Sequence, residues 1–140
     1  MHQAVGWIIV SDFLHEQAIV VDTSNYYPGI MNEPIADIDQ GKPESVWLAE
    51  QIGRPVIKAF NMLLAHSLIH LGKAKGEADR IAMFVAGDNL EDKQKVMTLV
   101  EDCGFEALDN GNLAHSWTQQ PNSAGYCCDY TADELRKLLL

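Results

Sequence analysis

The chain has 140 residues, of which 47% are hydrophobic, and a formal net charge of −10 at pH 7. This length and composition are typical of one globular domain, so we treat residues 1–140 as a single domain. The acidic balance, without a stripe of basic residues, argues against a partner made of nucleic acid, because phosphates require clustered Lys and Arg.

The cysteines and the amino-terminal apolar run indicate the compartment of the protein and whether it associates with a membrane. Cys103, Cys127 and Cys128 are an odd number and contain no Cys-x-x-Cys pair, so neither a zinc site nor a dithiol redox motif is indicated. Free thiols favour a reducing cytoplasm. The apolar run 4–10 has no positively charged leader and is far too short to span a bilayer. We therefore expect a cytoplasmic protein without a membrane partner.

The first clear element in the sequence is a strand that ends at Asp22. The β-branched run 19–21 is apolar on both faces, as buried parallel strands are. The apolar run before it is too short for periodicity to distinguish strand from helix. We favour a helix that continues through Phe13 and Leu14 and packs on the strand.

A helix and a second strand follow a long loop. Residues 29–42 are rich in Asn, Asp, Gly and Pro, which indicates a functional or a flexible loop. Pro43 suits the first turn of a helix, and Gly53 suits its left-handed end. The expected apolar face consists of Val46, Trp47, Ala49 and Ile52, and the expected solvated residues are Glu44, Glu50 and Gln51. Residues 55–60 then predict a strand that ends at Asn61.

The second half of the chain continues the alternation of helix and strand. Asn61 is placed to cap a helix over residues 62–71, and a basic loop leads to a strand at 81–86. Asp88 and Glu91 have the spacing of a capping box for the next helix, with Asp in place of Ser or Thr. The apolar stripe predicted for that helix is Val96, Leu99, Val100 and Cys103.

A last strand, an irregular tail and a final helix complete the chain. Residues 105–109 predict the strand, and residues 113–130 are irregular and aromatic. Thr131 and Glu134 form a capping box for a helix whose stripe is Leu135, Leu138 and Leu139. Strands that alternate with helices need crossover connections, so the sequence predicts a three-layer α/β fold with a mainly parallel sheet.

Polar side chains follow the first two predicted strands. Thr23, Ser24 and Asn25 come directly after the first strand, and Asn61 follows the second. Ligands of open α/β sheets bind at the carboxyl ends of the strands, so these positions are candidates for a site. Asn and Ser after a strand are also common as turn residues and helix caps, so neither strand end establishes a site alone.

Two kinds of binding site can be tested directly in the sequence. His66 and His70 are one helical turn apart, but Ser67 stands where a zinc protease has Glu, and no other ligand is placed to complete a metal site. The Gly-x-Gly-x-x-Gly loop that holds a dinucleotide pyrophosphate is absent, because no two glycines are separated by one residue.

A series of motifs, in order along residues 18–140, resembles one enzyme family. The motifs are VVDTSNYYP at 20–28, PES at 43–45, GRPVIKAFN at 53–61, VAGD at 85–88, GFEALDNG at 104–111 and SW at 116–117. They resemble NADP-dependent oxidoreductases grouped with the deazaflavin (coenzyme F-420)-dependent NADP reductases. The cytoplasmic domain of the six-transmembrane metalloreductases is a more distant resemblance.

The resemblance implies that this chain is the carboxyl-terminal part of a Rossmann-like domain. In the family, the glycine loop and the strand end that reads the adenosine 2′-phosphate lie upstream of the part similar to residues 18–140. Residues 1–17 do not resemble that first half. We therefore expect an N-terminally truncated NAD(P)-binding domain: a shortened reading frame, a cut fragment or a remnant with another role.

The activity implied by the resemblance is hydride transfer between the nicotinamide of NADP and a flavin-like or other small acceptor. The residues that match the nicotinamide-side wall of the family are Thr23, Ser24 and Asn25, with Lys58, Ala59, Phe60 and Asn61 opposite. Hydroxyls and amides would bind the carboxamide or the ribose, and Phe60 would pack near the ring. No general acid or base is implied, because hydride transfer can proceed without one.

Two functions from different classes remain open at this point. The first is an NADP-dependent oxidoreductase that is not competent as this fragment alone. The second is a non-catalytic interaction or scaffold module that kept the sheet and lost the phosphate loop. Hydrolysis by Ser24, with His115 and Asp109 as partners, is disfavoured because the Gly-x-Ser-x-Gly elbow is absent.

The first strand is also expected to leave an unpaired edge, and such edges recruit partners. We therefore expect a homo-oligomer with Ile8, Ile9 and Ile19 buried at the contact. The alternative is that the amino-terminal segment folds back over the edge and the acidic surface keeps the chain monomeric.

Overall fold

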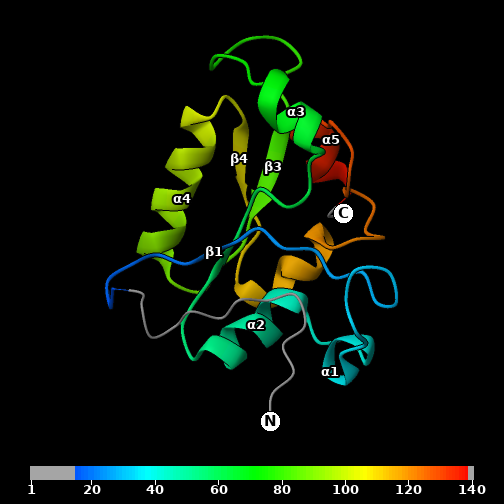
Figure 1. Cartoon of the computed structure of the whole chain (residues 1–140). Coiled ribbons are helices and arrows are strands. Elements are labelled where there is room, and N and C mark those ends of the chain that lie inside the picture. Colours follow the sequence, from blue (N-terminus) through cyan, green and yellow to red (C-terminus); the bar gives the residue numbers. More distant parts are fainter. Residues whose placement is uncertain (1–14, 139–140) are drawn as a thin grey trace.

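The computed structural model describes residues 15–138, which form a layered α/β unit (Figure 1). Its strands form two parallel pairs, β1 with β2 and β3 with β4. The strands are β1 (Val21–Asp22), β2 (Ile57–Lys58), β3 (Ala82–Val85) and β4 (Glu106–Asp109). All four predicted strands are therefore present, in parallel pairs and in the predicted order, although each is shorter than the predicted run.

The two strand pairs are joined at one position rather than along a continuous sheet. The N–H of Lys58 donates to the carbonyl of Ala86 at 2.8 Å, and the N–H of Ala86 donates to the carbonyl of Lys58 at 3.1 Å. The predicted strand 55–60 cannot extend further because Phe60 has φ 65°, which turns the backbone out of the extended conformation.

The helices lie on both sides of the strands. They are α1 (Ala36–Asp39), α2 (Glu44–Ile52), α3 (Ala65–His70), α4 (Leu90–Asp102) and α5 (Ala132–Lys137), with a 3-10 helix, η2 (Leu113–Gln119). In Figure 1, α4 lies on one side of β3 and β4, and α3 and α5 lie on the other, while α2 packs near η2 below the strand ends. None of these helices is long and apolar enough to cross a membrane.

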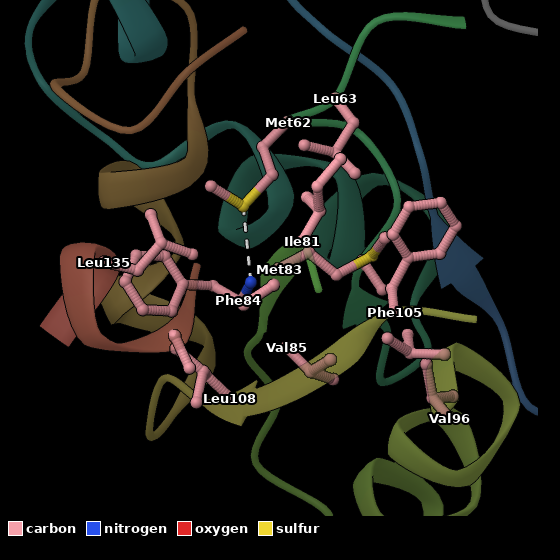
Figure 2. Packing of buried hydrophobic residues seen from close by; sticks show 14 of the residues in the cluster. Met62, Leu63, Ile81, Met83, Phe84, Val85, Val96, Phe105, Leu108 and Leu135 are labelled. Carbon is pink, nitrogen blue, oxygen red and sulfur yellow. Dashed lines mark hydrogen bonds between the residues drawn. The ribbon is translucent and has the colours of Figure 1, made fainter. Parts of the chain in front are cut away.

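The hydrophobic core surrounds β3. All four residues of β3 are buried, and Phe84 and Phe105 are at most 1% exposed (Figure 2). Burying an aromatic or aliphatic side chain of this size contributes about 1.5–3 kcal/mol. Figure 2 also shows the Sδ of Met62, which accepts a hydrogen bond from the N–H of Phe84 at 3.3 Å. The core therefore ties the segment after β2 to the central strand.

Two of the predicted helix starts are wrong. Helix α3 begins at Ala65 rather than at residue 62, because the side chain of Asn61 bonds elsewhere and does not cap it. Helix α4 is capped by Asn89, whose Oδ1 accepts from the N–H of Asp92 at 3.0 Å. Asp88 instead accepts from the N–H of Leu113 at 3.0 Å, and so fixes the start of η2.

Other helix ends follow the prediction. Gly53 has a left-handed φ of 64° and ends α2, and the capping box of Thr131 and Glu134 begins α5. The stripe of α5 is only partly right, because Leu135 is fully buried but Leu138 is 42% exposed, and Leu139 lies outside the described residues. The helix predicted through Phe13 and Leu14 also lies outside the described residues.

Helix α4 buries two of the four residues of the predicted stripe, Val96 and Val100, and leaves the other two exposed. Its buried residues are Lys93, Val96 and Val100, whereas Leu99 is 48% exposed and Cys103 is exposed. Lys93 can be buried because its ammonium bonds to the carboxylate of Asp109 at 2.7 Å, so the aliphatic stem packs while the charge is paired.

Candidate functional site at the ends of β1 and β2

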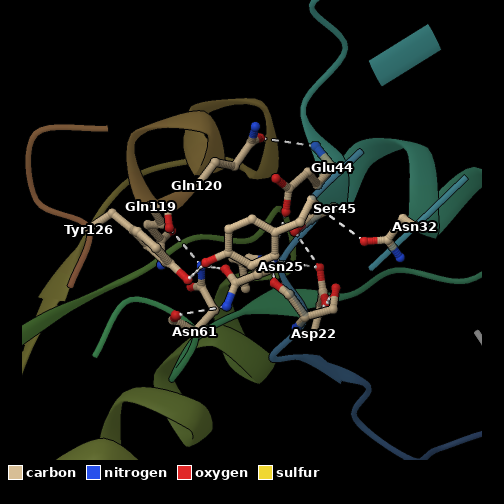
Figure 3. Close-up of polar contacts among 12 residues, drawn as sticks. Asp22, Asn25, Asn32, Glu44, Ser45, Asn61, Gln119, Gln120 and Tyr126 are labelled. Atoms are coloured by element: carbon tan, nitrogen blue, oxygen red, sulfur yellow. Dashed lines mark hydrogen bonds and ion pairs between the residues drawn. The ribbon is translucent and has the colours of Figure 1, made fainter. Parts of the chain in front are cut away.

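The two polar strand ends meet at one edge of the β1–β2 pair. The Nδ2 of Asn25 donates to the carbonyl of Asn61 at 3.1 Å, and the Nδ2 of Asn61 donates to the Oδ1 of Asn25 at 3.0 Å (Figure 3). Because β1 and β2 are parallel neighbours, their carboxyl ends lie side by side. The structure therefore brings together the two asparagines that the sequence placed at separate strand ends.

Asn61 has one polar atom left over. Its Nδ2 also donates to the carbonyl of Gln119 at 2.6 Å, so both amide hydrogens are used. Its Oδ1 is buried and has no hydrogen-bond partner among residues 15–138. Buried acceptors are normally satisfied, so an orphan acceptor at a strand end suggests that something else donates to it.

A buried ion pair lies beneath these asparagines. Lys58 is completely buried, and its Nζ contacts the Oδ2 of Asp22 at 3.1 Å and the carbonyl of Ser24 at 2.6 Å. The hydroxyls of Ser24 and Ser45 also donate to the Asp22 carboxylate. The backbone N–H of Ser24 donates to it as well, at 2.9 Å. These bonds fix the turn after β1, because four donors converge on one carboxylate and the lysine crosslinks it to β2.

Glu44 joins this cluster, although the sequence predicted that it would be solvated. It is 5% exposed, and its Oε2 lies 3.8 Å from the Nζ of Lys58, with no hydrogen-bond partner among the described residues. Burial raises the pKa of Glu44 to about 7, although the Lys58 ammonium opposes the shift. Two carboxyls share one ammonium here, so a proton on Glu44 leaves the cluster without net charge.

Asp22 responds to the same surroundings in the opposite direction. Burial acts to raise the pKa of its carboxyl, but the Lys58 ammonium and the hydroxyls of Ser24 and Ser45 outweigh burial and lower it. Asp22 therefore carries the negative charge of the cluster at neutral pH. Of the two carboxyls, Glu44 is the one that exchanges a proton near neutrality.

Phe60 has a backbone conformation that bulky side chains rarely adopt. Its φ of 65° lies in the left-handed region, where a non-glycine residue of this size is strained. The N–H of Ala59 donates to the carbonyl of Asp22 at 3.2 Å, and the Asn61 side chain is fixed by the bonds described above, so both neighbours hold the turn in place. The ring of Phe60 is half-buried against the core.

The other predicted cofactor-binding residues differ in accessibility. Thr23 is exposed and Ser24 is half-buried, whereas Ala59 and Lys58 are completely buried. A bound molecule can therefore reach Thr23 directly. It would not contact Lys58 or Ala59, which would affect binding only by holding the neighbouring turns in position.

The residues considered for hydrolysis do not meet. The hydroxyl of Ser24 donates to Asp22, Asp109 is paired with Lys93, and His115 is exposed beside Gly111. No hydrogen bond within residues 15–138 connects Ser24 with His115 or Asp109, so this geometry provides no activated nucleophile.

The two histidines of α3 lie next to each other without a further metal ligand among the described residues. The rings of His66 and His70 lie 4.8 Å apart between centroids and are tilted by 53°. The described residues contain no group of three or more His, Cys, Asp or Glu that could hold a metal ion.

Several residues of the cluster were not among the sequence candidates. Glu44 and Ser45 belong to the PES motif at 43–45, so the resemblance contained a signal for them, whereas the helical pattern placed Glu44 in solvent. Gln119 is buried, and its Nε2 donates to the carbonyl of Phe84 at 2.8 Å. It lies in the tail that the sequence left irregular, where no pattern marked it.

Comparisons with known proteins agree with the fold. No protein-family model matches the chain. A protein of Escherichia coli (strain K12) named YjhV is 47% identical over 79 residues, which are 56% of this chain and 50% of that protein. The hypothetical protein SMa0349 of Sinorhizobium meliloti has a similar structure, with a TM-score of 0.66 and 26% identity over 82% of this chain and 55% of its own.

A second solved structure is named after an activity. It is provisionally described as an F420-dependent NADP-reductase of Arthrobacter sp. FB24, and it matches with a TM-score of 0.51 and 23% identity over 67% of this chain and 43% of its own. This likeness shows an NADP-reductase-like fold. The match spans about half the length of each of these three relatives.

Proposed function

We propose that this chain forms the nicotinamide-side part of an NADP-dependent oxidoreductase, which transfers hydride between a nicotinamide and a flavin-like or other small acceptor. The observation that carries the proposal is the paired Asn25 and Asn61 at the carboxyl ends of two parallel strands, with the buried Oδ1 of Asn61 left without a donor among the described residues. The carboxamide of nicotinamide carries the N–H groups that such an acceptor lacks.

In this proposal, some of the surrounding residues contact the nicotinamide and the others support the turns that carry them. Thr23, Ser24 and Asn25 contact the carboxamide or ribose from one side, and Phe60 and Asn61 form the opposite side of the ring site. Lys58 and Ala59 lie beneath and hold the two turns in position through Asp22. The nicotinamide, when bound, supplies the hydride, and the protein supplies orientation and the exclusion of water.

The similarity of the fold to an NADP reductase supports hydride transfer as the reaction. The sequence indicates that this chain alone has a low affinity for NADP. A solved structure that carries the name of an NADP reductase shares this fold. The 140-residue chain has no Gly-x-Gly-x-x-Gly loop, whose backbone donors supply much of the affinity for a dinucleotide. We propose NADP as the cofactor, with weak or no binding by this chain alone, and a reducing cytoplasm as the location of the protein.

The nicotinamide half of the cofactor is the direct probe of the proposal. Reduced nicotinamide mononucleotide should shift the side-chain amide NMR signals of Asn25 and Asn61 at millimolar concentration, whereas adenosine 2′,5′-bisphosphate should leave them unchanged. Asn61→Ala should weaken binding at least tenfold. The matched control is Gln94→Ala, on the exposed face of α4, which should bind like the parent chain.

Titration calorimetry with NADPH completes this test. The isolated chain should show no binding tighter than micromolar, because the phosphates find no glycine loop. If the mononucleotide leaves both asparagine amides unchanged, or if Gln94→Ala weakens binding as much as Asn61→Ala, the nicotinamide site is excluded.

A non-catalytic interaction module is the second candidate, and one observation favours it. Most polar groups at the strand ends are satisfied within the chain, and Lys58 is sealed from solvent by Asp22, Glu44 and the carbonyl of Ser24. A network closed in this way is sufficient to fix the two strand ends without any ligand. This alternative predicts that no nicotinamide compound binds, so the same NMR titration separates the two functions.

A further inference from the structure

The tail between η2 and α5 carries two neighbouring thiols that the proposed hydride transfer does not use. Cys127 is exposed, Cys128 is partly exposed, and both are free. The N–H of Cys127 donates to the carbonyl of Met62 at 2.8 Å, so the backbone that carries the pair is anchored to the core. The Sγ of Cys128 lies 3.5 Å from the carbonyl of Tyr126.

The spacing of the two residues disfavours a direct disulfide. Consecutive Cα atoms are about 3.8 Å apart across a trans peptide, whereas disulfides usually join Cα atoms that are about 4.4–6.8 Å apart. An S–S bond between Cys127 and Cys128 would therefore be strained and easily reduced. A bridging atom between the two sulfurs enlarges the ring by one member and removes much of that strain.

The surroundings of the pair select the kind of atom that can bridge it. Structural zinc sites use four protein ligands, and catalytic ones use three. The described residues contain no group of three or more His, Cys, Asp or Glu arranged for a metal ion. A centre that needs only two thiolates from the protein is therefore the one that fits, and a trivalent arsenic atom that carries one organic group meets this requirement.

We propose that Cys127 and Cys128 form a vicinal dithiol site that binds trivalent organoarsenicals. With phenylarsine oxide, both thiols add to arsenic, two As–S bonds form, and the two thiol protons leave with the arsenic-bound oxygen as one water molecule. Arsenic remains trivalent and neither sulfur is oxidised, so no further reagent is required. The product is one phenylarsine bridging Cys127 and Cys128 in each chain.

The site has a structural connection to the β1 end. The phenol of Tyr126, the residue directly before Cys127, is hydrogen-bonded to the phenol of Tyr27. Tyr27 lies two residues after Asn25 in the same turn. A bridged Cys127 therefore sits one side chain away from the segment that leads to the strand ends, and the Tyr126 backbone signal should respond to binding.

Intact-mass spectrometry after incubation with phenylarsine oxide tests the site. The parent chain should gain one phenylarsine that survives excess 2-mercaptoethanol and is removed by 2,3-dimercaptopropanol, since only a dithiol competes with a chelating pair. Cys128→Ser and Cys127→Asn should each lose the monothiol-resistant adduct. Asn is chosen at 127 because the residue there has φ 56°, a conformation that Asn tolerates.

Cys103→Ser is the matched control, because this cysteine lies at the end of α4 and should not contribute. It should keep the full adduct. Thermal melts of all variants establish that each is folded during the incubation. The proposal is overturned if the parent chain yields no monothiol-resistant adduct, or if Cys127→Asn or Cys128→Ser retains it.

Discussion

Lys58 has its ammonium in a region that solvent does not reach, with carboxyls on two sides. Lys58→Met would leave Asp22 and Glu44 without a counter-charge in the interior. Breaking a buried pair in this way costs about 3–5 kcal/mol, because the remaining charge is neither solvated nor paired. We expect urea unfolding to show a loss of stability of that size.

The control for this substitution is Lys95→Met. Lys95 and Glu91 form an exposed pair one helical turn apart, with side chains 57% and 79% exposed, and such pairs contribute little to stability because solvent screens them. A second comparison is the double variant Lys58→Met with Glu44→Gln, which should recover part of the loss because one unpaired carboxyl is removed. Equal losses for Lys58→Met and Lys95→Met would contradict the buried pair.

Glu44 should make the stability of the protein depend on pH near neutrality. Its pKa is raised from 4.5 to about 7 in the folded chain, by burial. The folded state therefore binds more protons than the unfolded state between these values, and stability falls as pH rises through this window. The groups that face Glu44 are Lys58, Asp22 and Tyr26. We expect the free energy of unfolding to fall by on the order of 2 kcal/mol from pH 5 to pH 8.

The comparison for this prediction is Glu44→Gln, which has the same shape and no titrating proton. The two chains differ at this residue alone, so the difference between the two pH profiles isolates Glu44. The Gln variant should lose the fall above pH 5. A parent profile that rises over this range would contradict the burial-induced shift, because it would require the pKa of Glu44 to be lowered on folding.

Residues that depend on tertiary contacts were the ones that the sequence predicted least well. Asn61 and Asp88 both have the chemistry of a helix cap, and each is instead used by a segment distant in sequence, Asn61 by Gln119 and Asp88 by Leu113. Glu44 was assigned to solvent by helical periodicity, which cannot register the lysine that β2 brings to it. Capping rules and helical periodicity use only neighbours in the sequence. A partner that is distant in sequence can therefore change the role of a side chain without any local signal.

At the scale of the elements, the loop between α3 and β3 and the loop between α4 and β4 approach closely at Gly72 and Gly104. Gly104 has φ 94°, and a Cβ there would lie 2.8 Å from the Cα of Gly72 and 2.9 Å from the backbone N of Lys73. Both contacts are with backbone and cannot move aside. Gly104→Ala should therefore destabilise the chain by about 3 kcal/mol, the sum of the left-handed penalty and the overlap.

Gly76→Ala separates these two causes. Gly76 has a similar φ of 89°, but nothing lies within 4 Å of the Cβ position. Its substitution should cost only the backbone part, about 1–2 kcal/mol. Chemical denaturation of the two variants gives the difference, and equal losses would mean that the approach of Gly72 to Gly104 has no energetic role.

Whole elements were easier to predict than their limits. The capping box at Thr131 and the glycine at 53 fixed two helix ends correctly, because each signal is local. The four strands were found from apolar runs, but β2 stops at Lys58 where Phe60 turns left-handed, and a bulky residue gives no sequence signal for that turn. The 3-10 helix η2 has a capping Asn112 but no apolar period.

At the scale of the molecule, β1 is the strand expected to recruit a partner. Within residues 15–138 it pairs with β2 alone. A groove of about 520 Å³ is lined by residues 16–20 and 54–57 and by the first turns of α4. We predict a homo-oligomer with Ile19 at the contact, measured as a dimer or larger mass by light scattering at micromolar concentration.

Ile19→Asp is the variant that tests this contact. A charge at the interface should convert the oligomer to a monomer, and it should also lower the melting temperature, because Ile19 packs against the core of its own chain. The residues Ile8 and Ile9, also predicted at the contact, lie outside the described part of the chain. A monomeric parent with a cooperative melt would instead support an edge that is covered within one chain.

The single junction between Lys58 and Ala86 has a consequence for how the protein opens. The β3–β4 pair has α4 and α5 packed on it, whereas the β1–β2 pair meets it through two backbone hydrogen bonds and through the side chains of Val21, Ile57 and Ala59. Such a division favours separate cooperative units, so amide hydrogens of β1 and β2 should exchange with solvent through a partial unfolding that leaves β3 closed. The β1 and β2 ends that would contact a cofactor would then be the first part of the molecule to unfold locally.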